Sequence, residues 1–312
     1  MLSQKSRQAL DTLKEYSPYI DHYQTSKRSA VLVALVANPE GELEVILTVR
    51  SSALRTNAGD SAFPGGKKDP EDADLIATAK REAFEEVGLP ISEPEFLTSF
   101  PPILSRHMQV VTPIVAFCPH LATQDVRKKL YPNPGEVVAI FTAPLESFLS
   151  PNPPECHESF DMDWIFSPHR IHRFERCGRH NFLLGQPDGQ SSSTGYREAK
   201  KAASLGALAT RVEEGMPSTF SPPTLPLPEE LENSGTGKVE EDEEEEEEAG
   251  RAVDRSKAGW PVYGLTASVL IEVATVAYQR EPDFEVYAPG QMIDQDKITE
   301  WYNGKYGPSA RM

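Results

Sequence analysis

The chain of 312 residues carries a formal net charge of −17 at pH 7, and about half of that excess comes from nine consecutive acidic residues at 240–248. This length fits one large domain or two small ones, and the acidic balance excludes nucleic acid as an expected partner. The three cysteines lack CxxC spacing, so we expect a reducing compartment rather than disulfides or zinc. We expect no membrane span, no signal peptide and no mitochondrial transit peptide, because apolar runs are short and the N-terminus contains acids.

The N-terminal part of the chain predicts a helix and a hairpin. Apolar residues at 10, 13 and 16 indicate an amphipathic helix over 3–16, which we expect to pack on the folded body. The valine-rich run 29–37 predicts a buried strand, and the alternation at 42–50 predicts a second one. Turn residues at 38–41 lie between them, so the two strands should pair.

A helix is predicted over 73–87. Asp72 is a good N-cap residue, Gly88 is a natural C-cap residue and Pro90 prevents continuation. Apolar residues recur at spacings of three and four and form one helix face: Leu75, Ile76, Ala79, Ala83 and Val87.

Three acids crowd the C-terminal end of this helix. Glu82, Glu85 and Glu86 fall within an arc of roughly 100°. They repel one another by about 0.2–0.5 kcal/mol per pair, and they oppose the helix macrodipole. Either this is a solvated acidic face beside an ordinary Gly65-Gly66 turn, or a cation offsets the repulsion. For oxygen ligands, that cation would be Mg²⁺ or Mn²⁺.

The combination of a Gly-Gly turn, a helix and Arg81 directly before these acids resembles the Nudix box, G-x5-E-x7-R-E-U-x-E-E-x-G-U with U apolar. Gly66 opens the box, and Gly88 and Leu89 close it. The chain departs from the pattern because the first acid is Asp72 and eight residues separate it from the arginine. In the family that acid mainly orients the arginine, so the departure concerns support of the arginine and not the metal ligands.

The preceding stretch, ILTVRSSALRTNAGDSAFPGG at 46–66, is similar to the signature of coenzyme A pyrophosphatases, L-L-T-x-R-S-A-S-x3-R-x3-G-x3-F-P-G-G. Ile46 and Ser52 are mild departures. The resemblance to the Nudix hydrolase family covers roughly residues 29–185 and 259–282. The matching positions are Leu47, Thr48, Arg50, Ser51, Arg55, Gly59 and 63–66.

The resemblance implies an α/β Nudix fold, a mixed β-sheet sandwiched between helices, and hydrolysis of a diphosphate bond. For coenzyme A the products would be 3′,5′-ADP and 4′-phosphopantetheine, and acyl derivatives would give acyl-phosphopantetheine. The implied metal ligands are Glu82 and Glu86, with the Gly66 carbonyl, while Glu85 would bind a second Mg²⁺ or Mn²⁺ ion or orient the attacking water. Arg81 would hold a glutamate in place.

The same resemblance places substrate-binding groups around the Gly-Gly turn. Gly65 and Gly66 would let the backbone approach the diphosphate. Arg50 and Arg55 would bind the nucleotide phosphates, because guanidinium groups bind phosphate bidentately, although arginines on a loop are as often solvated.

After the box, strands are predicted at 95–100, 107–117 and 137–141, followed by a final hairpin within 145–185. The V-T-P at 111–113 and N-P-x-E-V at 133–137 resemble further subfamily motifs, which makes Glu136 either an additional acid near the site or a surface residue. His107 is expected to be structural. The W-P-V-Y-G-L-T-A run at 260–267 resembles the W-G-L-T-A that begins the last helix of the subfamily, here predicted to reach residue 279.

We therefore expect a helical extension at 1–28, one domain formed by 29–185 and 259–282, and a tail at 283–312. Residues 186–258 are rich in proline, serine and acids, which predicts a disordered insertion. The terminal Ala310-Arg311-Met312 is a degenerate peroxisomal address, so a peroxisomal import receptor is an expected partner and the cytoplasm is the alternative location.

Two other functions remain open at this point. Another Nudix substrate, such as an oxidised nucleoside triphosphate, ADP-ribose or NADH, would use the same box. A catalytically silent binding module would instead use the acidic insertion to recruit a basic partner.

Overall fold

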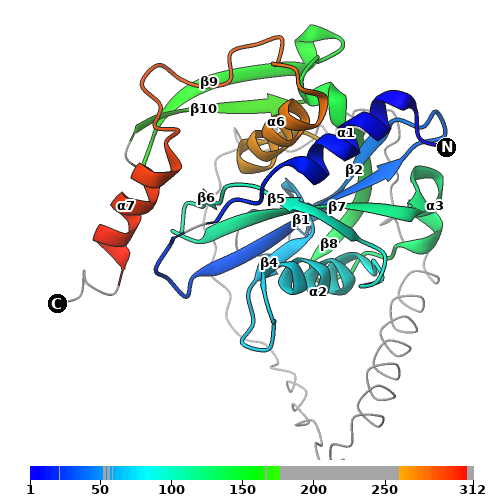
Figure 1. Ribbon diagram of the computed structural model, residues 1–312, viewed down its shortest axis with the longest axis horizontal. Helices are drawn as coiled ribbons and strands as arrows, with labels where there is room; N and C mark the ends of the chain where they lie inside the picture. Colours follow the sequence, from blue (N-terminus) through cyan, green and yellow to red (C-terminus); the bar gives the residue numbers. More distant parts are fainter. Residues whose placement is uncertain are drawn as a thin grey trace, which may run out of the picture.

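A computed structural model describes residues 1–20, 22–51, 54, 57, 59–165, 167–175 and 260–307 (Figure 1). The expected disordered insertion at 186–258, the terminal tripeptide at 310–312 and Arg55 lie outside the described residues.

Within the described residues, the larger sheet has eight strands in the order β3-β2-β1-β7-β5, with β8 beside β2, β4 beside β1 and β6 beside β7. β1 and β7 are parallel and the remaining pairs are antiparallel, so the sheet is mixed. The strands are β1 (Arg28–Ala37), β2 (Leu43–Arg50), β3 (Ser61–Ala62), β4 (Gly65–Lys67), β5 (Glu95–Ser99), β6 (Ile103–Leu104), β7 (Val110–Ala122) and β8 (Val137–Pro144).

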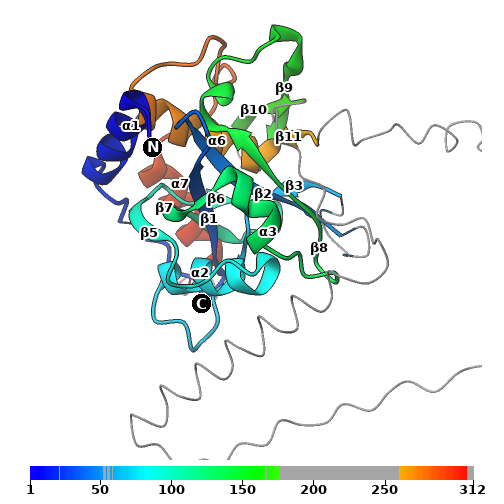
Figure 2. The same cartoon turned by 90° about the vertical axis from the view of Figure 1, so that its right-hand side faces the viewer.

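Helices lie on both faces of this sheet, as expected from the sequence. Figures 1 and 2 show α1 (Gln4–Glu15) and α6 (Gly264–Tyr278) on one face and α2 (Leu75–Val87) on the other. The remaining short helical segments are α3 (Thr123–Lys129), η1 (Leu145–Phe148) and η2 (Pro154–Cys156). None of the helices in the described part of the chain is long and apolar enough to cross a membrane.

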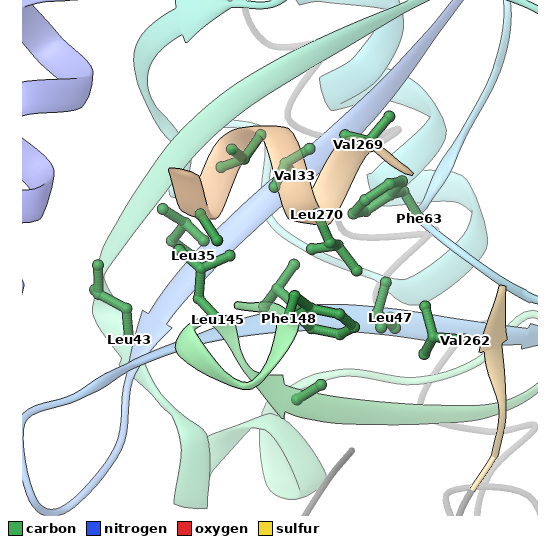
Figure 3. Packing of buried hydrophobic residues seen from close by; sticks show 14 of the residues in the cluster. Val33, Leu35, Leu43, Leu47, Phe63, Leu145, Phe148, Val262, Val269 and Leu270 are labelled. Carbon is green, nitrogen blue, oxygen red and sulfur yellow. The ribbon is translucent and has the colours of Figure 1, made fainter. Parts of the chain in front are cut away.

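The run of apolar residues in β1 is explained by this arrangement, because a strand covered on both faces needs apolar side chains on both. Val33 and Leu35 point into the cluster that contains Leu270 of α6 (Figure 3). Leu32 and Ala34 point to the opposite face, into a second cluster with α2. The predicted hairpin is confirmed by the antiparallel pairing of β1 and β2.

The N-terminal helix packs on the body as predicted. Ser3 caps α1 by accepting a hydrogen bond from the backbone N–H of Ser6. Leu10 and Leu13 are buried in the same cluster as α6. The expected helical extension therefore contributes to the hydrophobic core on the α6 face of the sheet.

A smaller sheet joins the chain segments on either side of residues 176–259. It has the order β11-β10-β9, with β9 (His157–Trp164), β10 (Ser167–Phe174) and β11 (Val262–Tyr263). The predicted final hairpin is the antiparallel pair β9 and β10. Because β11 pairs with β10, the part of the chain that begins at Trp260 completes a sheet begun before residue 176.

Two expectations about the elements are corrected. Residues 283–312 are not only a tail, because 295–306 form α7 (Gln295–Tyr306), capped by Asp294. Its residues Ile298 and Tyr302 are buried beside Tyr23, which an i, i+4 spacing makes possible. The strand predicted from 107 begins only at Val110, since Met108 has a φ of +57° in the preceding turn.

Candidate active site

Gly65 and Gly66, expected to form a turn, are the first two residues of the short strand β4, which pairs with the start of β1 and contacts the helix α2; the name Gly-Gly turn is kept for this segment. Gly65 and Gly66 pair with Val31 and Ala30 of β1. A β-carbon on Gly65 would lie 2.5 Å from the Ala30 carbonyl oxygen, and one on Gly66 would lie 2.4 Å from a Glu82 carboxylate oxygen. Gly65 therefore needs to be glycine, because backbone atoms of β1 occupy the space of a side chain, whereas a side chain at Gly66 would require the Glu82 carboxylate to move.

The start of α2 differs from the sequence prediction. Asp74 is the N-cap, with its carboxylate accepting from the Ala77 N–H at 2.7 Å, and the helix begins at Leu75. The predicted cap, Asp72, is instead buried and turned toward Arg81. Sequence reasoning chose the wrong one of two aspartates because both are good capping residues. The predicted C-cap is confirmed, since Gly88 is left-handed with a φ of +70°.

Arg81 is held by a set of acceptors on one side of α2. Its Nε and Nη2 donate to the two oxygens of Asp72, each at 2.9 Å, and Nη2 also donates to the Lys67 carbonyl at 3.0 Å. Its Nη1 lies 3.0 Å from Glu85 and 3.1 Å from Glu82. The hydrogen bonds and nearby charge of Arg81 hold the pKa of the Asp72 carboxyl well below its usual range.

Glu86 is the most buried of the three box glutamates. Its Oε2 accepts a hydrogen bond of 3.1 Å from the Gly65 N–H, and its Oε1 lies 4.0 Å from Nη1 of Arg50. Burial raises the pKa of Glu86 to about 8, and burial also raises the pKa of Glu82. A cation beside these two carboxylates would offset that desolvation.

Glu136 belongs to the same electrostatic environment. Its negative charge contributes to the raised pKa of both Glu82 and Glu86. It lies just before β8, and its carbonyl accepts from the Ser51 N–H at 2.8 Å. Glu136 is also exposed, so it is a surface acid at the start of a strand, as one of the two alternatives expected, and its charge acts on the site glutamates from there.

Of the other predicted site residues, some lie at the site and others do not. Glu85 is the most exposed of the three box glutamates, with 45% of its side chain accessible, and it pairs with Arg81 rather than with the Gly-Gly turn. Arg50 reaches Glu86, whereas Arg55 lies outside the described residues. His107 is exposed in the turn before β7. Asp60, which accepts a hydrogen bond from the Tyr263 hydroxyl beside β3, was not identified from the sequence.

The carboxylate oxygens at this site are suitable ligands for a hard divalent cation, but they are not arranged to surround one. Among the described residues, no group of three or more histidine, cysteine or acidic side chains is placed to hold a metal ion. Glu82 and Glu86 do face the same Gly65–Gly66 turn and supply only oxygen atoms, which Mg²⁺ and Mn²⁺ prefer. The present contacts of Glu82 and Glu85 with Arg81 would have to loosen for further carboxylate oxygens to join them.

Comparison with known proteins agrees with this geometry. Residues 26–177 match the family model described as the NUDIX domain. The chain is 41% identical over 160 residues to "Nudix hydrolase 15, mitochondrial" of Arabidopsis thaliana, which covers 51% of this chain and 53% of that protein. It is 39% identical over 159 residues to "Nudix hydrolase 22, chloroplastic" of the same plant, covering 51% and 50%.

The chain thus spans about half the length of these curated relatives. A solved structure described as a Nudix hydrolase from M. smegmatis, RenU, is 19% identical, covers 41% of this chain and 82% of that one, and has a TM-score of 0.32. The mixed sheet with its box helix has the Nudix fold, in agreement with the family model matched by the sequence. This chain contains such a domain over residues 26–177 and has Nudix hydrolases among its homologues.

Proposed function

We propose that the protein is a Mg²⁺- or Mn²⁺-dependent Nudix hydrolase that cleaves the diphosphate bond of coenzyme A or its derivatives. One observation carries the hydrolase assignment: Glu82 and Glu86, one helical turn apart, both face the Gly65–Gly66 turn. A helix designed only for stability would not bury like charges there.

Each of these residues has one role in the proposed reaction. Glu82 and Glu86, with the Gly66 carbonyl, would hold the cation, and Glu85 would serve a second ion or orient the attacking water after leaving Arg81. A bound divalent cation neutralises phosphate charge and lowers the pKa of bound water. Arg81, fixed by Asp72, positions the glutamates. Arg50 would bind a substrate phosphate from its place beside Glu86.

The substrate assignment rests on motifs outside the box. The 46–66 stretch, with its match to the coenzyme A pyrophosphatase signature, includes Arg50, Gly65 and Gly66, which lie at the site. Cleavage would give 3′,5′-ADP and 4′-phosphopantetheine, or the acylated form of the latter. A panel of coenzyme A, acyl-CoA, ADP-ribose, NADH and oxidised deoxynucleoside triphosphates, with product identification, tests this. We expect coenzyme A or a derivative to exceed every other substrate in kcat/KM by about tenfold, a difference of about 1.4 kcal/mol in transition-state binding. Equal or faster cleavage of another class would overturn the substrate assignment.

The Glu86→Gln variant tests the metal assignment. Removing one charge from the shared cation site should lower kcat by about 10²–10³-fold, the range expected when one group that stabilises transition-state charge is lost. Glu71→Gln, an isosteric change of an exposed acid in the loop before α2, should retain full activity. Near-normal turnover of Glu86→Gln would reject the assignment.

The cellular location is a separate proposal. The names of the two plant relatives place them in mitochondria and chloroplasts, and the comparisons do not support a peroxisomal location. The Ala310-Arg311-Met312 tripeptide therefore stays a prediction. A fluorescent protein fused to the N-terminus should enter peroxisomes only when the tripeptide is intact, and location unchanged by its deletion would contradict the prediction.

A further inference from the structure

The backbone of Arg50 is held by the two residues that precede β3. Its N–H donates to the Asp60 carbonyl at 2.9 Å, and its carbonyl accepts from the Gly59 N–H at 3.1 Å. The pairing of β2 with β8 shifts register between Val49 and Arg50, so the regular ladder is interrupted at this point. Gly59 and Asp60 therefore fix the place where Arg50 leaves the sheet.

The guanidinium group of Arg50 has few contacts of its own to orient it. Its Nη1 lies 4.0 Å from Oε1 of Glu86, a separation longer than a hydrogen bond. Its Nε is buried and has no hydrogen-bond partner among the described residues. The direction of the side chain therefore depends on the position of the Arg50 backbone, because no strong side-chain contact would correct a displacement.

Two residues from a distant part of the chain contact the segment that holds Arg50. The Tyr263 hydroxyl donates to the Asp60 carboxylate, and the Thr266 hydroxyl donates to the Ser61 carbonyl at 3.1 Å. The partners lie 203 and 205 positions apart in the chain. Since β3 is only two residues long, its own pairing with β2 gives this segment little support. Tyr263 and Thr266 supply contacts that the short strand lacks.

The Tyr263 hydroxyl is a hydrogen-bond donor at any pH at which the protein works. Burial, followed by the hydrogen bond and the charge of Asp60, raises the pKa of Tyr263 to about 12. Tyr263 is itself held in place, since it pairs with Arg173 of β10 and its neighbour Val262 lies in the hydrophobic core. Its ring is therefore attached to a supported strand from which it can position Asp60.

We propose that Tyr263 and Asp60 are positioning residues that hold Arg50 where its guanidinium group binds a substrate phosphate. The inference rests on the proposed function, in which Arg50 is a phosphate ligand. Tyr263 lies outside residues 26–177, which match the NUDIX domain model. The segment that begins at Trp260 thus completes the substrate site of that domain.

Steady-state kinetics of the full chain, with the substrate of the panel that is cleaved fastest, tests the proposal. Tyr263→Phe removes one hydroxyl group and keeps the ring. We expect it to raise KM by about tenfold and to change kcat by less than about twofold, because Arg50 binds the phosphate in the ground state and the transition state alike. Tyr287→Phe, the same change at a tyrosine that is 52% exposed, is the matched control and should leave both constants unchanged.

A double-mutant cycle with Arg50→Gln identifies the residue through which Tyr263 acts. Once Arg50 is replaced, Tyr263→Phe should change kcat/KM by less than about twofold. Asp60→Asn keeps an oxygen that accepts from the Tyr263 hydroxyl and should retain most of the affinity, whereas Asp60→Ala should match Tyr263→Phe. A full tenfold effect of Tyr263→Phe in the Arg50→Gln background would overturn the proposal, and so would an unchanged KM of Tyr263→Phe alone.

Hydrogen exchange measured by NMR separates this inference from the hydrolase assignment, because it needs no substrate. The amides of Arg50 and Gly59 should exchange at least about tenfold faster in Tyr263→Phe than in the wild type, while the amide of the buried Val33 in β1 should be unchanged. Unchanged exchange at Arg50 and Gly59 would overturn the inference even if coenzyme A is cleaved. Failure to cleave any substrate of the panel would instead reject the proposed function, and the exchange rates alone would then decide whether Tyr263 holds Arg50.

Discussion

The guanidinium group of Arg81 meets both carboxylate oxygens of Asp72, with two N–O distances of 2.9 Å. Asp72 comes from the loop before α2 and Arg81 from its second turn, so this pair ties the Gly-Gly loop to the helix that carries the acids. Only 6% of the Asp72 side chain and 23% of the Arg81 side chain are exposed. The pair is therefore shielded enough from water to matter for stability.

Asp72→Asn should lower the free energy of unfolding by about 2–3 kcal/mol, because two hydrogen bonds to a charged partner are weakened and Arg81 loses its closest counter-charge. Urea denaturation at pH 7 measures this. Asp74→Asn is the matched control, since asparagine caps a helix as well as aspartate does. Equal stability of the two variants would show that the pair contributes little.

Gly66→Ala should displace the Glu82 carboxylate from its place against the Gly-Gly turn. The new methyl group would lie 2.4 Å from the Glu82 carboxylate, so Glu82 must move. A displacement of about 1 Å at a reacting centre can cost about 10²-fold in rate. We expect such a loss of kcat with the fold retained. Gly304→Ala in α7, where nothing lies within 4 Å of the added carbon, should keep full activity; an active Gly66→Ala would contradict the assigned role of the turn.

His157 and His172 should make stability depend on pH. Their rings share a hydrogen bond of 3.0 Å, from Nε2 of His157 to Nδ1 of His172, among the rings of Phe174 and Phe284. Burial, followed by the His172 charge, lowers the pKa of His157 to about 4. Burial also lowers the pKa of His172.

The unfolded chain, with histidine pKa values near 6.5, therefore binds protons before the folded protein does. The contribution of these two histidines to the free energy of unfolding should be fully present above pH 6.5. It should fall as the pH drops from 6.5 toward 4, by at most about 1.4 kcal/mol per pH unit for each histidine. His157→Phe should reduce this slope, as denaturation at pH 7.5 and 5.5 would measure. An unchanged slope would exclude the histidine pair as its source.

Tyr302 should provide much of the free energy that holds α7 against the rest of the fold. The residue is 1% exposed, it packs against Tyr23 with ring centres 5.2 Å apart, and its hydroxyl donates to the Met108 carbonyl at 3.1 Å. Tyr302→Phe should cost about 1 kcal/mol of unfolding free energy, and Tyr302→Ala about 3–5 kcal/mol. Equal effects of the two variants in thermal unfolding would place the contribution in the hydroxyl and not in the ring.

The sequence correctly predicted the helices and strands whose buried residues recur at a regular spacing. The apolar run 29–37 predicted β1, and the spacing of apolar residues predicted α2, because a buried face imposes its period on the sequence. Local patterns failed where two residues were chemically equivalent. Asp72 and Asp74 are both good N-caps, and only the position of Arg81 decides which of them caps the helix.

The C-terminal helix was missed for a related reason. Its buried residues Ile298 and Tyr302 fill a site made by Tyr23, Leu104 and Val110, which lie far away in the chain. A short polar helix with few apolar residues is not stable alone, so its own sequence is a weak signal.

The amino-acid sequence alone determined the box, because helical geometry puts Arg81, Glu82 and Glu86 at set angles wherever that helix occurs. Only the tertiary structure decided what those side chains meet. Glu82 lies against Gly66, Glu86 accepts from Gly65, and Glu85 turns to Arg81, since the pairing of β4 with β1 brings the turn against α2. Contacts between distant segments depend on how strands pair and layers pack, and no local spacing encodes that arrangement.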